Sequence, residues 1–214
     1  MFSTSLLCTA GGDIADISHK SCGEEIGAIK SGVIQKLRNN NGDLNTIAVA
    51  DAPLLATYTP LLTDILGAKI QVLPILNNVS SEGGDKIEYG GGDETSGGIP
   101  IIMQNAEPTS ISGELIRRKS ETITTLRSYN GLEGLGIYLF NEEGEMWGIA
   151  DDIATPTTIY PIPLYSFFVG SKVIGNRSNP DKNMISWAFL DGWQDNLYGF
   201  QPAFDVVADL IVTV

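Results

Sequence analysis

The sequence predicts a mainly β protein, an antiparallel β-sandwich or β-barrel with one flanking α-helix. Its 214 residues suit one such unit, because sandwiches and barrels commonly fold as single domains of about 200–250 residues. The 24 glycines and 10 prolines break the chain into short segments, most of them rich in β-branched or aromatic residues. No repeat, low-complexity tract or charge block marks a linker, so we expect one β-rich domain over residues 1–214.

The first section, residues 1–36, is rich in Gly and Ser and is a candidate N-terminal arm that reaches a neighbouring subunit. Within it, Ile26–Leu37 is a weak strand candidate, and the Asn39–Asp43 segment that follows is typical of a turn. Further on, Pro60 at a first-turn position and Gly67 as a stop predict one or two helical turns.

A predicted strand at Ala68–Leu76 leads into residues 77–98, which we expect to form a long, polar, glycine-rich loop. Loops of this length are uncommon in compact domains unless they have a function. Two interpretations stay open. The loop becomes ordered against the next copy of an assembling subunit, or it is a plain surface loop.

A strand at Ile111–Ile116 is followed by a predicted helix that Ser120 is placed to cap and that Asn130-Gly131 ends. Three apolar residues of this helix fall at helical spacing, namely Ile123, Leu126 and Tyr129. This helix is the one that we expect to flank the sheets.

A β-hairpin and three more strands complete the predicted fold. Leu135–Phe140 and Glu145–Ile149 flank a turn that a glycine closes. Ile159–Val169 and Met184–Leu190 are strand-like, with a Gly-, Asn- and Pro-containing turn region between them. The run Val206–Val214 is almost wholly apolar, which is typical of a strand buried on both faces or at a subunit contact.

The charge of the chain limits its partners. With 26 acidic and 13 basic residues the formal charge is −13, which argues against a sequence-independent grip on phosphate. An acidic channel wall would instead repel DNA and let it slide, although solubility alone also explains the charge. The concentrated positive patch, Arg117–Lys119 with Arg127 nearby, is a candidate for cross-subunit pairing or a solvated strand end.

We predict no catalytic, cofactor-binding or metal-binding residues, and therefore no enzyme. The single histidine, His19, has no nucleophile signature beside it, and Cys8 and Cys22 lack metal or redox spacing. The Gly90–Gly92 run lacks the Lys-Ser/Thr of a phosphate loop and the spacing of a dinucleotide fold. No apolar stretch reaches the roughly 18 residues that a membrane-spanning helix needs, so a membrane is not an expected partner.

Two acidic pairs are the remaining candidates for chemistry. Glu142 with Glu143, and Asp151 with Asp152, could supply the acid and the base of a small hydrolase. Adjacent acids at a hairpin tip and in a turn are more often solvated charge.

The middle and end of the chain resemble virion proteins of tailed bacteriophages, especially tail-tube and neck-ring subunits. The similarity covers about half the chain and rests on the order of a helix, a hairpin and a later strand. Its segments are Glu121–Tyr129, Asn130-Gly131, Gly136–Phe140 with Glu145–Ile149, and Ser186–Leu190.

The resemblance implies a β-sandwich whose sheets join side by side into rings, with a long loop and terminal arms that bridge stacked rings. The partners would be other copies of the chain, which form hexameric rings, and other virion proteins. Genomic DNA would pass through the rings without sequence-specific binding. The location would be the virion, assembled in the host cytoplasm. Four aromatic residues are candidate ring anchors or buried core: Trp187, Trp193, Tyr198 and Phe200.

Two alternatives of a different class stay open. A capsid-associated or head-decoration protein would share the β-rich, acidic, non-catalytic profile, but would bind shells as a monomer or trimer. A small hydrolase would need a pocket of convergent polar groups, which one histidine does not supply.

Overall fold

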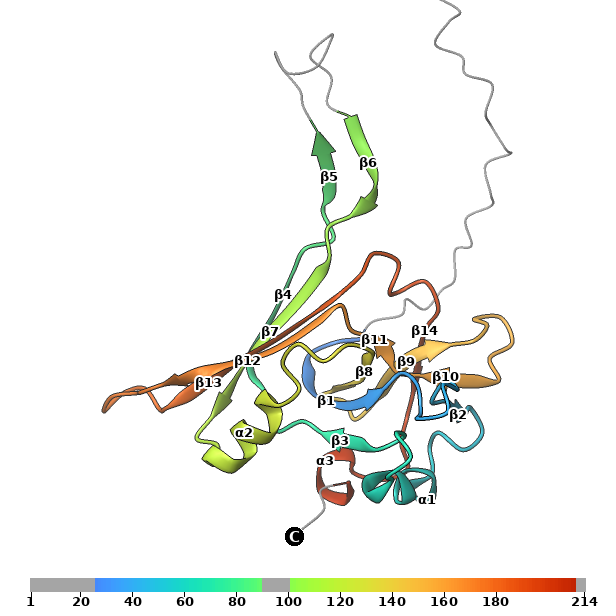
Figure 1. Ribbon diagram of the computed structural model, residues 1–214, viewed down its shortest axis with the longest axis horizontal. Helices are drawn as coiled ribbons and strands as arrows, with labels where there is room; N and C mark the ends of the chain where they lie inside the picture. Colours follow the sequence, from blue (N-terminus) through green and yellow to red (C-terminus); the bar gives the residue numbers. More distant parts are fainter. Residues whose placement is uncertain (1–25, 90–100, 211–214) are drawn as a thin grey trace, which may run out of the picture.

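Two antiparallel sheets form the body of the protein (Figure 1). The computed structural model describes residues 26–89 and 101–210. The large sheet has the strand order β2-β10-β9-β8-β1-β3, with β11 paired to β8 and β14 paired to β9. The bounds of these strands are β1 Ile29–Lys36, β2 Ile47–Ala48, β3 Ile70–Val72, β8 Leu135–Asn141, β9 Met146–Ala150, β10 Thr158–Tyr160, β11 Ile162–Pro163 and β14 Leu197–Phe200.

The small sheet has the order β12-β13-β7-β4, and a separate pair of strands, β5 and β6, extends from it. Their bounds are β4 Asn77–Glu82, β5 Lys86–Tyr89, β6 Ile101–Ala106, β7 Thr109–Ile116, β12 Ser166–Val173 and β13 Lys182–Phe189. The helices are short: α1 Leu55–Tyr58, the 3-10 helix η2 Pro60–Thr63, α2 Ser120–Arg127 and α3 Val206–Asp209.

Both faces of the large sheet are buried. One face packs against the inner face of the small sheet and against α2, through a cluster that includes Ile137, Leu139 and Trp187. The other face is covered by the short helices, where Tyr138 and Phe140 contribute to a second cluster. Because strand side chains alternate between faces, every residue of β8 is buried, and its residues 135–140 form a continuous apolar run.

The prediction of a mainly β, antiparallel fold with a flanking helix is confirmed. The β8–β9 hairpin also forms as predicted, with Gly144 at φ +92° in its turn. In that conformation a side chain would be strained, which explains the glycine.

Three predicted segments are corrected. The strand predicted at Ile26–Leu37 is confirmed as β1, Ile29–Lys36, but it lies in the middle of the large sheet, so the candidate arm does not extend over these residues. The predicted loop at 77–98 is wrong for residues 77–82 and 86–89, which are β4 and β5. The final apolar run begins as helix α3 and not as a strand, because the Asp205 carboxylate accepts hydrogen bonds from the N–H groups of Val207 and Ala208. Residues 1–25, 90–100 and 211–214 of these segments lie outside the described residues.

Smaller differences concern boundaries. Helix α2 begins at Ser120, and its N-cap residue is Lys119, without a side-chain cap. The predicted strand at Ile159–Val169 is divided into β10, β11 and β12. Proline at 161 removes a backbone donor at the first break. Strands β2, β6 and β14 were not predicted from the sequence.

Truncation of a buried β8 residue tests the central position of this strand. We expect Leu139→Ala, at a fully buried residue, to lower the free energy of unfolding by about 2–5 kcal/mol. Leu132→Ala, at a residue that is 49% exposed, is the matched control and should change it by about 0.5 kcal/mol or less. Urea unfolding curves measure both, and equal losses would contradict the assigned core.

Candidate assembly interface

A long hairpin arm projects from the small sheet. Strands β4 and β7 pair in the body as far as Glu82 opposite Ser110, and the same two chain segments then continue outward as β5 and β6. Figure 1 shows β5 and β6 extending beyond the body at one end of β4 and β7, with α2 at the other end. We call residues 83–108 the arm. Its residues 90–100 are not described.

The junction between body and arm depends on glycine. Gly83 has φ +102°, and a Cβ atom there would lie 2.2 Å from the carbonyl oxygen of Pro108. Gly84, at φ +79°, donates its N–H to the Glu107 carbonyl at 3.2 Å. The arm therefore leaves the sheet through a bend that a side chain at position 83 would disrupt.

The turn after β13 braces the base of the arm. Asp191 Oδ2 accepts the N–H of Ala106 at 3.1 Å, and Trp193 Nε1 donates to Thr109 Oγ1 at 3.3 Å. The Trp193 ring also stacks on buried Phe189, with centroids 4.6 Å apart. These contacts fix the root of the arm to the body.

Beyond its root the arm has little support from the described part of the chain. Among the described elements, β5 and β6 pack extensively only on each other. Ile87 is exposed, and Lys86 forms an ion pair with Glu88 on the surface of β5. A two-stranded hairpin is marginally stable by itself in water, so packing against a partner would stabilise this one.

The two outer strands of the small sheet differ in how far they are covered. Beside β12, the side chain of Asn130 accepts the Val169 N–H at 2.8 Å and donates to the Val169 carbonyl at 3.1 Å, as a neighbouring strand would. Beyond this contact, Val173 and Ile174 at the end of β12 are exposed. The outer edge of β4 pairs with no strand in the described part of the chain, so the sheet is open there.

The predicted aromatic anchors divide between core and support. Trp187 is 1% exposed and belongs to the core between the sheets. Trp193 braces the arm, as described above. Tyr198 and Phe200, on β14, are half-buried and pack against the second cluster.

The basic cluster lies where β7 ends and α2 begins. Arg118 Nη2 donates to the Ile75 carbonyl at 3.0 Å, which holds this side chain on the body. Arg117 and Lys119 are exposed, and neither forms an ion pair with a described residue. Arg127 is exposed at the other end of α2.

The acidic pairs do not have the environment of an acid and a base. Hydrogen bonds from the Thr157 hydroxyl and from the N–H groups of Thr158 and Thr157 hold the pKa of Asp151 well below its ordinary value. The Ala154 N–H and the Thr155 hydroxyl likewise lower the pKa of Asp152. A general acid at neutral pH needs a raised pKa, so both carboxylates instead serve to hold the 151–158 turn.

The other acidic pair is similarly placed. Glu142 and Glu143 are exposed at the tip of the β8–β9 hairpin, as the solvated interpretation expects. His19, Cys8, Cys22 and Gly90–Gly92 lie outside the described residues. Among the residues that are described, no three His, Cys, Asp or Glu side chains are grouped to hold a metal ion.

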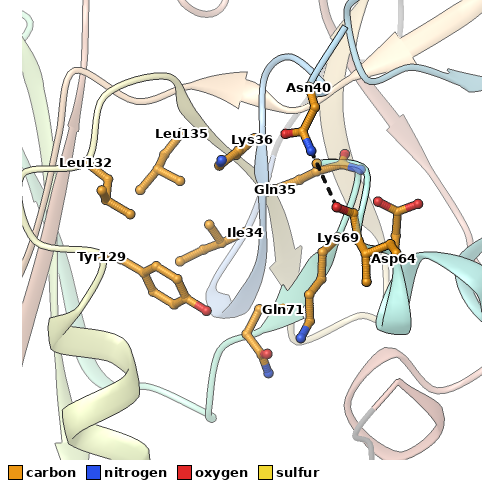
Figure 2. A pocket seen from close by; sticks show the side chains of 12 residues that line it. Ile34, Gln35, Lys36, Asn40, Asp64, Lys69, Gln71, Tyr129, Leu132 and Leu135 are labelled. Atoms are coloured by element: carbon orange, nitrogen blue, oxygen red, sulfur yellow. Dashed lines mark hydrogen bonds between the residues drawn. The ribbon is translucent and has the colours of Figure 1, made fainter.

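A groove of about 360 Å³ lies beside β1 and is the kind of surface where a small molecule could bind (Figure 2). Ile34, Tyr129, Leu132 and Leu135 form its apolar side.

Three polar side chains around this groove bond to backbone groups, whereas the buried Gln35 Oε1 has no hydrogen-bond partner among the described residues. Asp64 Oδ1 accepts from the N–H groups of Leu66 and Ala68 at 2.8 and 2.9 Å. Gln35 Nε2 donates to the Ala68 carbonyl at 2.7 Å, and the dashed line in Figure 2 marks the bond from Asn40 to the Ile65 carbonyl. These bonds shape the 64–68 turn, and the groove lining contains no hydroxyl or thiol nucleophile paired with a base.

Comparison of the chain with protein-family models and with curated proteins found no match. Across residues 26–89 and 101–210, no helix has the length and apolar character to cross a bilayer.

The 151–158 turn predicts an acid-dependent loss of stability. Because the pKa of Asp151 is lower in the folded protein than in the unfolded chain, its contribution is complete above the unfolded value of about 3.9 and fades as the pH falls toward the folded value. We expect Asp151→Asn to lower the melting temperature at pH 7, and the difference from wild type to shrink at pH 3. Glu143→Gln, which removes an exposed charge, is the control. A difference that is constant with pH would contradict this role.

Proposed function

We propose that this chain is a structural subunit of a tailed-bacteriophage virion, which forms tail-tube or neck-ring oligomers around a path for DNA. The observation that supports an assembling role best is the arm, a braced hairpin that leaves the body and whose described strands, β5 and β6, add no residue to either core cluster. A chain that acts alone gains nothing from holding such a hairpin in water, whereas an assembling chain gains a contact that reaches a neighbour.

Other features are consistent with this proposal. The open edge of β4 and the exposed apolar end of β12 lie at opposite sides of the small sheet. Edge contacts of this head-to-tail kind close into rings when the rotation between copies allows it. The net charge of −13 would keep a DNA backbone from adhering to the inner wall of such a ring.

A capsid-associated or head-decoration role is the alternative that the coverage of β12 by Asn130 favours. A covered edge limits strand addition by a neighbouring copy. A decoration protein would use its arm on a shell and would itself remain a monomer or trimer.

The size of the purified protein tests the proposal. We expect mass measurements and negative-stain images, over a range of protein and salt concentrations, to show rings or tubes with sixfold symmetry. A stable trimer would favour the decoration role. A chain that remains monomeric at every concentration would contradict the ring and tube proposal.

Removal of the arm tests its part in assembly. We expect replacement of residues 84–108 by Asn-Gly, a two-residue turn suited to joining β4 and β7, to abolish rings and tubes. The melting temperature should stay close to that of wild type, because the deleted strands contribute little to the body core. Rings of unchanged abundance from this variant would show that the arm is dispensable.

A further inference from the structure

The small sheet has opposite charges at its two ends. At the end where β7 meets α2, basic side chains predominate: Arg117, Arg118, Lys119, Lys172, Arg177 and Lys182. These are six of the 13 basic residues in the chain. The register places Val173, Lys182 and Ile116 in one row across the sheet, so the three segments end together.

The acids at this basic end do not cancel its charge. Glu114 is paired with Lys182, and the Asp181 carboxylate accepts the Gly175 N–H at 2.8 Å. Glu121, in the first turn of α2, is the remaining acid beside the cluster. The end therefore remains net positive, with Arg117 and Lys119 exposed.

Acidic side chains predominate at the opposite end, around the root of the arm. They are Glu82, Asp85, Glu88, Glu107, Asp191 and Asp195, all exposed. Lys86, paired with Glu88, is the basic residue among them. Asp191 is held at the root by its bond to Ala106, so part of this charge has a fixed position.

The distance between the two ends separates their fields. The six residue-to-residue steps of β7 from Ser110 to Ile116 span about 20 Å at roughly 3.3 Å per residue. The Debye length at physiological ionic strength is about 8 Å. Each end therefore presents its own sign to whatever approaches it, although the chain as a whole is acidic.

We propose that the acidic end of the small sheet in one copy docks onto the basic end in a second copy, so that copies stack head to tail along the strands. This inference rests on the assembling role proposed above and adds the surface that the root of the arm would meet. Each copy offers both halves of the contact, which can repeat without limit. A second copy suits the basic end better than nucleic acid does, because the rest of the chain would repel phosphate.

Two double charge reversals test the pairing, with sedimentation and negative-stain imaging as readouts. Glu82→Lys with Asp85→Lys removes most of the net negative charge of the acidic end, and Arg117→Glu with Lys119→Glu makes the basic end net negative. Each variant alone should need about tenfold more protein, or higher, to reach half-assembly at ~0.1 M salt. An equal mixture of the two variants should form pairs of copies that neither variant forms alone, because the unaltered acidic end of one variant still attracts the unaltered basic end of the other. Wild-type assembly should weaken as salt rises.

The control is Glu142→Lys with Glu143→Lys, which changes the net charge as much as the acidic-end variant but acts at the β8–β9 tip. It should assemble as wild type does. Circular dichroism and melting temperature establish that each variant is folded.

The outcomes separate this inference from the proposed function. If wild type assembles and both reversed variants assemble equally well, the docking inference is wrong and the assembling role stands. If only the acidic-end variant fails, the root of the arm meets another surface and this pairing is wrong. If wild type never assembles, both proposals fail.

Discussion

The burial of both faces of the large sheet is the constraint on which the rest of the structure depends. A strand in the middle of such a sheet needs apolar residues on both faces, and residues 135–140 of β8 meet this need with side chains that alternate between two clusters. The small sheet and α2 cover one face, while α1, η2 and α3 cover the other. The two core clusters draw their residues from these elements, and the described strands of the arm, β5 and β6, contribute none.

The same constraint explains where contacts to partners are available. Apolar residues of the small sheet that point inward, such as Ile185 and Trp187, are buried against the large sheet. What remains outside is the arm, the open edge of β4, the apolar end of β12 and the charged ends of the sheet. These surfaces are extended and shallow, which suits contact with another protein surface better than enclosure of a small substrate.

The site chemistry follows from local hydrogen bonding. Asp64, Asp151 and Asp205 each accept backbone N–H groups within a turn or helix start. Such bonds hold a carboxylate at a fixed position, where it shapes the backbone. Some acidic residues of the chain therefore stabilise turns and a helix start. The exposed acidic residues around the root of the arm are available to contact a partner.

The sequence by itself determined those elements whose signals are local. The alternation of β7, the apolar run of β8 and the glycine of the 141–144 turn depend on neighbouring residues, so a mainly β fold with a hairpin could be predicted. Asp205, a residue type that commonly caps helices, stands directly before the run at 206 and is the local signal that would have indicated helix α3. Only the tertiary structure decided that polar residues 77–82 pair with β7, that Ile29–Lys36 lies mid-sheet, and that the two charged ends lie about 20 Å apart. Strand pairing joins residues distant in the chain, and the pattern within one strand does not specify its partner.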